Sequence, residues 1–184
     1  MRQFGVVFLF LITLAAASTA MAQPNDRIPR GIEALRQQAS SKTDLTLDHS
    51  MLILASKLEP DNEGLRRVIA GVSGISIHSY RFPGAGQYDL DSLSSVKADY
   101  QAAGWKQLMN NHENSGGQGV LDLWVRLENN AISDVAILLV KSDEIDFVAV
   151  AGSLSPLDIS HLSGHFGIPK IEGGVLVPNS ERRP

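Results

Sequence analysis

The sequence predicts an α+β fold of two layers, in which helices pack on one face of a mostly antiparallel sheet of about five strands. Apolar and polar residues alternate from Val120 to Leu127, which is typical of a half-buried strand. Short turns separate the neighbouring apolar segments, and such turns join antiparallel strands. Apolar residues at helical spacing precede and follow this region. The predicted order is therefore helix, strand, helix, four strands and helix.

Helical periodicity defines the first elements. A short helix ends near Ser40, and residues 44–48 are a brief extended stretch. A helix from Ser50 to Leu58 shows apolar residues at i, i+3, i+4 and i+7, which predicts one buried face. Asp61 or Asn62 can cap the helix after it. The apolar residues of the three helical faces are Ile32, Leu35 and Ala39; Met51, Leu54, Ala55 and Leu58; and Leu65, Val68, Ile69 and Val72.

From residue 75 onward the sequence predicts a strand, a helix and then a meander of antiparallel strands. Residues 75–82 form a strand, and Asp89 or Asp91 caps the helix that follows. That helix lies between strands 75–82 and 105–112, so these two are expected to run parallel with a right-handed crossover. The remaining strands are 120–127, 132–140 and 145–152; Asn129-Asn130 suits a tight hairpin, and Ser155-Pro156 opens a last helix that Gly164 ends.

Three residues of strand 120–127 point away from its leucines and valine. Asp122, Trp124 and Arg126 share one face of the predicted sheet. If this face is open to solvent, they form an amphipathic patch of the kind that interfaces favour. The alternative is a second core layer beneath the helices at 31–39 and 50–58. Both interpretations stay open.

The amino-terminal residues 1–22 predict a secretory signal peptide. A basic start precedes an uncharged apolar run from Phe4, and Ala20-Met21-Ala22 fits a cleavage site before Gln23. The run is shorter than the roughly 20 apolar residues of a membrane span. Without cysteine the chain has no lipid attachment point, so no membrane anchor is expected after cleavage. We expect an exported protein, either periplasmic or extracellular.

The expected mature chain is long enough for one domain and short for two. Residues 23–43 are a polar leader with a short helix, 44–172 form a single α+β domain, and 173–184 are a flexible tail in which 175–177 could pair with a sheet edge. The absence of cysteine excludes disulfides and thiol catalysis. A net charge of −4 with scattered basic residues argues against nucleic acid and anionic lipid as partners.

No catalytic, cofactor-binding or metal-binding signature is present. His161 and His165 have a spacing that can hold zinc on a helix, but Gly164 is expected to end the helix first and a third ligand is missing. Adjacent residues such as Asp48-His49-Ser50 cannot form a triad, because each side chain must hydrogen-bond the next in space. His78 on a strand is expected to be structural. No catalytic residue, metal or cofactor is therefore assigned.

Several motifs nevertheless resemble a known family. They are the run 68–75, Tyr80-Arg81-Phe82, Ala103-Gly104-Trp105, and the stretch 164–169. Over roughly 45–169 the chain resembles the domain-of-unknown-function 4252 family, a bacterial family of small exported proteins. The resemblance implies lipoproteins among the relatives, and the lack of cysteine sets this chain apart from them. The resemblance implies a fold and an export route, and it implies no catalytic residues.

Three functional hypotheses remain. The leading one is an exported, non-enzymatic binding module of the bacterial envelope, whose partner is an envelope protein or a small ligand. The second is an extracytoplasmic hydrolase with a site assembled from distant residues, for which His78, His112 and His161 are the candidate bases. The third is an envelope assembly or folding accessory that offers a sheet edge to a client strand.

Overall fold

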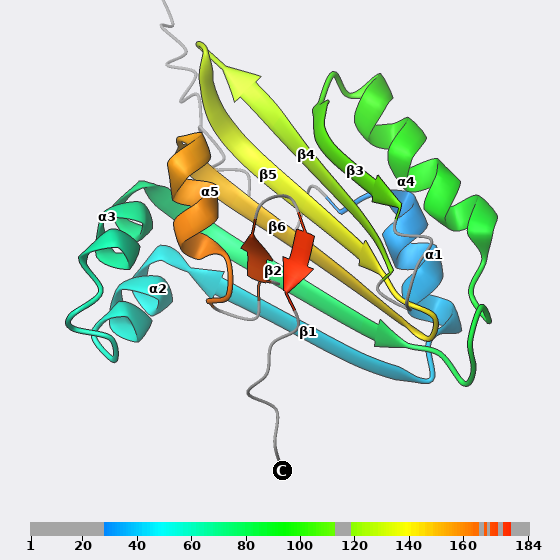
Figure 1. Cartoon of the computed structure of the whole chain (residues 1–184). Helices are drawn as coiled ribbons and strands as arrows, with labels where there is room; N and C mark the ends of the chain where they lie inside the picture. The colour runs from blue at the N-terminus through cyan, green and yellow to red at the C-terminus, as the bar shows by residue number, and fades with distance from the viewer. Residues whose placement is uncertain (1–27, 113–118, 166–167, 169, 173–174, 178–184) are drawn as a thin grey trace, which may run out of the picture.

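The computed structural model describes residues 28–112, 119–165, 168, 170–172 and 175–177 (Figure 1). These residues form five helices, a six-stranded sheet and a separate two-stranded sheet. The helices are α1 (Arg30–Gln38), α2 (His49–Ser56), α3 (Glu63–Gly71), α4 (Leu90–Ala102) and α5 (Pro156–Leu162). The strands are β1 (Ser41–Asp48), β2 (Val72–Arg81), β3 (Lys106–His112), β4 (Val120–Glu128), β5 (Ala131–Val140), β6 (Glu144–Leu154), β7 (Lys170–Glu172) and β8 (Val175–Val177).

The large sheet has the strand order β1-β2-β6-β5-β4-β3, and every neighbouring pair is antiparallel. The predicted α+β class and antiparallel sheet are thereby confirmed. The additional strand is β1, of which the sequence indicated only the stretch 44–48. β2 and β3 do run in the same direction, but β6, β5 and β4 lie between them.

Helices cover both faces of the sheet, which corrects the prediction of helices on one face. The helices α2, α3 and α5 pack on one face through a cluster that contains Leu52, Leu65 and Leu162. The helices α1 and α4 pack on the other through a cluster that contains Leu35 and Val96. Figure 1 shows the sheet as the middle of three layers. The physical reason lies in β5, where residues 134–140 are buried without alternation, as in strands covered on both sides.

The predicted caps and turns are found in the structure. Asn62 begins α3 by accepting a hydrogen bond from the Leu65 amide, and Asp89 caps α4. Ser155 and Asp158 form a capping box at α5, with Pro156 at the first helical position. The turn residues Asn129 and Asn130 both have positive φ, at 51° and 64°, as a tight hairpin requires.

The helix α2 presents a different face from the predicted one. Leu52 and Ser56 are buried, whereas Met51, Leu54 and Leu58 are exposed. Two contacts hold the start of the helix in this rotation. Asp48 accepts a hydrogen bond from the Met51 amide at 2.9 Å, and His49 Nδ1 donates to the carbonyl of Val72 at 2.7 Å. The apolar periodicity of this segment therefore marks its outer surface.

The ends of the chain add three observations. Residues 1–27, which include the predicted signal peptide, lie outside the described residues. The helix α1 falls within the predicted leader, and its Ile32 and Leu35 are fully buried, so this segment belongs to the folded core. Within the tail, β8 pairs with β7 and not with the large sheet. Across the described part of the chain, no helix has both the length and the apolar character needed to cross a membrane.

Candidate functional site

Two of the three residues expected on an open sheet face are buried. Trp124 and Asp122 are 1% and 0% exposed. The ring of Trp124 stacks on Tyr100 of α4, with centroids 5.8 Å apart. Asp122 is ion-paired with Lys97 Nζ at 2.9 Å and accepts a hydrogen bond from Gln107 Nε2 at 2.7 Å. This face therefore carries a second core layer, which is the alternative interpretation, and α1 and α4 cover it in place of α2.

Arg126 lies further along β4 and is partly exposed. Its Nε is 2.8 Å from Asp134 Oδ2, and its second guanidinium nitrogen is 2.8 Å from Glu128 Oε1. These ion pairs hold the Arg126 guanidinium beside Asp134 and Glu128. The three predicted residues thus do not form one solvent-facing patch.

The only histidine of β2, His78, is buried and belongs to a polar cluster with the exposed side chains of Asp44 on β1 and Arg36 on α1. Its Nδ1 donates to Asp44 Oδ1 at 2.7 Å, and Tyr80 and Arg36 also donate to this carboxylate, each at 3.2 Å. Burial alone would raise the pKa of Asp44, but the hydrogen bonds from His78 and Arg36 outweigh it, so the pKa lies below its usual range. Burial and the Asp44 charge raise the pKa of Tyr80.

This Asp44–His78 pair resembles the acid–base half of a catalytic triad, but it lacks a nucleophile. In a triad a hydroxyl group is hydrogen-bonded to the second imidazole nitrogen. Among the described residues, no group is hydrogen-bonded to His78 Nε2, and Ser76 Oγ, on the same sheet face, is also without a partner. The pair therefore acts to hold β1 and α1 against the sheet.

The remaining candidate histidines are dispersed. His161 of α5 packs against Gly64 of α3, where a Cβ would lie 3.0 Å from His161 Nδ1. His165 follows the end of α5 and lies 3.4 Å from Glu59 Oε1. The side chain of His112 lies outside what the structure describes. Within the described ranges, no group of three or more His, Asp or Glu residues could hold a metal ion.

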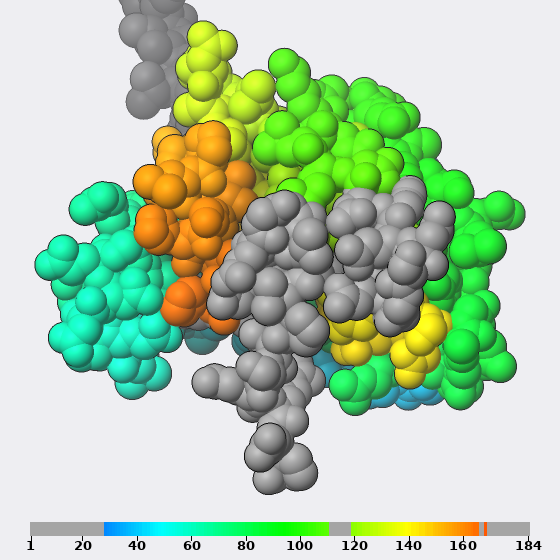
Figure 2. Space-filling view, in the orientation of Figure 1, coloured from blue at the N-terminus to red at the C-terminus, as the bar shows by residue number. Residues whose placement is uncertain are grey.

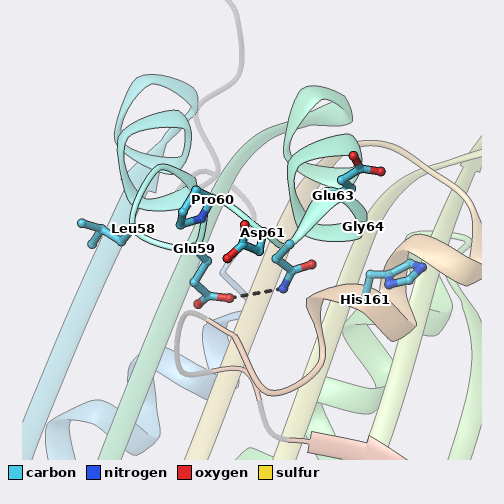
Figure 3. Close-up of a pocket in the computed structure, with 8 residues that line it drawn as sticks. Leu58, Glu59, Pro60, Asp61, Glu63, Gly64 and His161 are labelled. Atoms are coloured by element: carbon cyan, nitrogen blue, oxygen red, sulfur yellow. Dashed lines mark hydrogen bonds between the residues drawn. The ribbon is translucent and has the colours of Figure 1, made fainter.

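An open hollow of about 650 Å³ lies between the α2–α3 loop and α5 (Figure 3). Its carboxylates are those of Glu59, Asp61 and Glu63, and His161 closes it on the α5 side. In Figure 3, Leu58 points outward from the same loop. The hydrogen bond inside the hollow joins Asn62 Nδ2 to Glu59 Oε2 at 3.2 Å. The hollow is therefore an acidic surface depression.

Next to this hollow, α2 exposes an apolar surface, which we call the α2 patch. It consists of Met51, Ile53 and Leu54 of the helix and Leu58 of the loop that follows, with exposed fractions of 52%, 41%, 66% and 83%. The helix carries no Asp, Glu, Lys or Arg from His49 to Ser56. In Figure 2 the adjoining α3 region forms the outer left of the molecule. Met51 and Leu54, three residues apart, are neighbours on one side of the helix, and exposed apolar patches are characteristic of interaction sites.

The second exposed feature beside α2 is the edge strand β1. It pairs with β2 over its whole length without a register shift, and it is the last strand of the sheet among the residues that the structure describes. All its side chains except that of Leu47 are exposed. The opposite edge strand, β3, is interrupted by a register shift between Gln107 and Met109. β1 is therefore the more regular of the two edges.

Comparison with known proteins places the chain in a family. A family model described as "Domain of unknown function (DUF4252)" matches residues 37–162, a range that contains all six strands of the large sheet. No curated protein and no solved structure matches the chain.

Proposed function

We propose that this chain, which belongs to the DUF4252 family, is an exported, non-enzymatic interaction module of the bacterial envelope that binds a partner protein through the α2 patch. The exposure of Met51, Leu54 and Leu58 is the observation that carries the proposal. Exposing the apolar side chains of the α2 patch to water costs free energy, at about 25 cal/mol per Å² of apolar surface. A partner protein that covers the α2 patch removes this apolar surface from water, which favours binding by the same free energy per Å².

The charges around the α2 patch favour a protein over a lipid surface. Helices that lie on membranes combine an apolar face with Lys and Arg, which attract anionic headgroups. Here Glu59, Asp61 and Glu63 line the hollow that Leu58 adjoins. A complementary partner has an apolar segment for the α2 patch and basic side chains for the hollow.

The edge strand β1 supports a second candidate, the assembly or folding accessory. An exposed regular edge can accept an extended segment from another protein as an additional strand. The eight residues of β1 are long enough for such pairing. The hydrolase hypothesis receives no comparable support, because within the described ranges Tyr80 is the one hydroxyl group hydrogen-bonded to the Asp44–His78 pair.

A matched pair of leucine substitutions tests the α2 proposal. Leu54 and Leu90 are 66% and 68% exposed, and Leu90 lies on α4, away from the α2 patch. We expect the wild-type chain and Leu90→Lys to capture the same protein from cross-linked cell envelopes, and Leu54→Lys to lose it. Quantitative mass spectrometry of the captured proteins provides the measurement.

Two results would contradict the α2 proposal. The first is equal capture of all partners by Leu54→Lys and the wild type. The second is flotation with phosphatidylethanolamine–phosphatidylglycerol vesicles that Leu54→Lys abolishes, because this would assign the α2 patch to lipid. Urea unfolding of each variant checks that the fold is intact, since exposed substitutions change stability by only about 0.5 kcal/mol.

A further inference from the structure

Sulfur chemistry in this chain is confined to methionine, because cysteine is absent. Of the four methionines, Met1 and Met21 lie within the predicted signal peptide. Met51 belongs to the α2 patch and is 52% exposed, whereas Met109 of β3 is partly buried and packs against the core cluster under α2, α3 and α5. A dissolved oxidant must reach a sulfur atom to react with it. Of the two methionines among the described residues, Met51 is therefore the more accessible.

The start of α2 holds Met51 on the outer surface of the molecule. Asp48 accepts a hydrogen bond from the Met51 amide at 2.9 Å, and His49 Nδ1 donates to the Val72 carbonyl at 2.7 Å. Leu52, the next residue along the helix, is fully buried. A rotation of the helix that turned Met51 inward would break these hydrogen bonds and withdraw Leu52 from the core. The thioether of Met51 therefore stays exposed as long as the fold is intact.

A peroxide oxidises a thioether to a sulfoxide. A sulfur lone pair attacks one oxygen of hydrogen peroxide, and the O–O bond breaks as the S–O bond forms. The displaced hydroxide takes up the proton of the transferred oxygen and leaves as water, so sulfur loses the two electrons that the peroxide gains. Methionine sulfoxide reductases reverse the change. In that reaction two thiols supply the electrons and become a disulfide, and the oxygen leaves as water.

The sulfoxide changes the α2 patch at the surface that a partner would cover. It is polar and accepts hydrogen bonds, whereas the thioether packs as an apolar group. Met51 lies three residues before Leu54 on the same side of the helix, so the new oxygen is close to another exposed apolar side chain. An apolar partner surface offers this oxygen no donor, and a polar group that is buried without a hydrogen bond costs free energy. Oxidation therefore opposes binding at the α2 patch.

We propose that Met51 is a reversible oxidation site: the α2 patch binds its partner protein when Met51 is a thioether and releases it when Met51 is a sulfoxide. This inference rests on the proposed function of the α2 patch and adds the chemical class of the signal that regulates it, a peroxide. Because the Met51 side chain is on the outside of α2, its oxidation leaves the core packed.

Peptide mass mapping after graded treatment with hydrogen peroxide tests the chemical step. Each sulfoxide adds one oxygen atom, about 16 Da. In the folded chain we expect Met51 to be oxidised before Met109. In concentrated urea, where both side chains are in solvent, we expect the two rates to be equal. Oxidation of Met109 first, or equal rates in the folded chain, would overturn the proposal.

Capture of the partner protein tests the effect on binding. The purified chain is treated with peroxide, freed of it and only then added to cell envelopes, so that oxidation is confined to this chain. Met109→Leu keeps Met51 as the one thioether of the described residues, and each variant is compared with its own untreated form. We expect peroxide to abolish capture by the wild type and by Met109→Leu, and a methionine sulfoxide reductase to restore it. Peroxide should leave capture by Met51→Leu at its untreated level.

The outcomes separate this inference from the proposed function. If Leu54→Lys loses the partner but the oxidised wild type keeps it, the oxidation site is refuted and the α2 patch stands. If peroxide also abolishes capture by Met51→Leu, another residue is responsible and the proposal is wrong. If Leu54→Lys and the wild type capture equally, the α2 proposal fails and the oxidation site fails with it.

Urea unfolding of the oxidised chain distinguishes release of the partner from loss of the fold. We expect the midpoint of oxidised Met109→Leu to equal that of its untreated form, since exposed changes alter stability little. A clearly lower midpoint would attribute the loss of capture to unfolding and would overturn the proposal.

Discussion

Two leucines of one helix provide a direct test of how α2 lies on the sheet. Leu52 is 0% exposed and Leu54 is 66% exposed, although they are two residues apart in the same helix. Each Leu→Ala substitution has the same effect on charge and on helix propensity, so any difference in stability reports burial. A fully buried leucine contributes about 1.5–3 kcal/mol, and the cavity left by truncation raises the loss to about 2–5 kcal/mol.

For Leu54 only about a third of the side chain is removed from water, so the same scale gives about 0.5–1 kcal/mol. We expect Leu52→Ala to be less stable than Leu54→Ala by about 2 kcal/mol or more, measured as the free energy of unfolding in urea. With a typical urea slope, this difference moves the midpoint by about 1–2 M. Equal losses, or a larger loss for Leu54→Ala, would refute the rotation of α2 and with it the α2 patch.

Two further predictions concern the α1 side of the molecule. Gly31 is the point where α1 meets α4, and a Cβ there would lie 2.3 Å from the Ser92 carbonyl and 2.7 Å from Val96; Gly31→Val should cost about 1–3 kcal/mol in thermal unfolding, and an unchanged transition would show that the helices are further apart. Because the folded pKa of Asp44 is depressed, its ionised form stabilises the fold above its ordinary pKa of about 3.9, and this contribution is lost as pH falls from that value through the lower folded pKa. Asp44→Asn should therefore be less stable than the wild type at pH 7 in urea unfolding, and the difference should shrink as pH falls below about 3.9, whereas a difference that stays constant with pH would exclude a contribution from the ionised Asp44 carboxylate.

The sequence predicts local features of this fold well because their physics is local. Asn62 and Ser155 each bond an amide three residues further along the chain, so the residue type and spacing suffice. The hairpin at Asn129-Asn130 is equally local, since Asn tolerates the positive φ that the turn requires. Each of these positions was predicted from a window of a few residues.

The features that the sequence leaves open depend on distant segments. Alternation in β4 places Trp124 and Asp122 on one face, but whether α4 covers that face depends on packing outside the strand. Periodicity in α2 identifies an apolar stripe without saying which side meets the sheet. His78 is hydrogen-bonded to Asp44, which is 34 positions away in the sequence, and no spacing rule predicts this contact. The signal for helices on both faces was nonetheless present, as the unbroken apolar run of residues 135–140.

The strand order has a consequence for synthesis of the chain from its amino terminus. The inner neighbour of β2 is β6, which begins at Glu144, whereas β2 ends at Arg81. At about 5–20 residues per second, roughly 3–13 seconds separate the two strands on the ribosome. During that interval β1 can pair with one edge of β2, but the edge that later pairs with β6 has no neighbouring strand to bond its backbone groups. The sheet therefore cannot form around β2 until β6 has been synthesised. In this period a chaperone of nascent chains can bind the unpaired edge of β2.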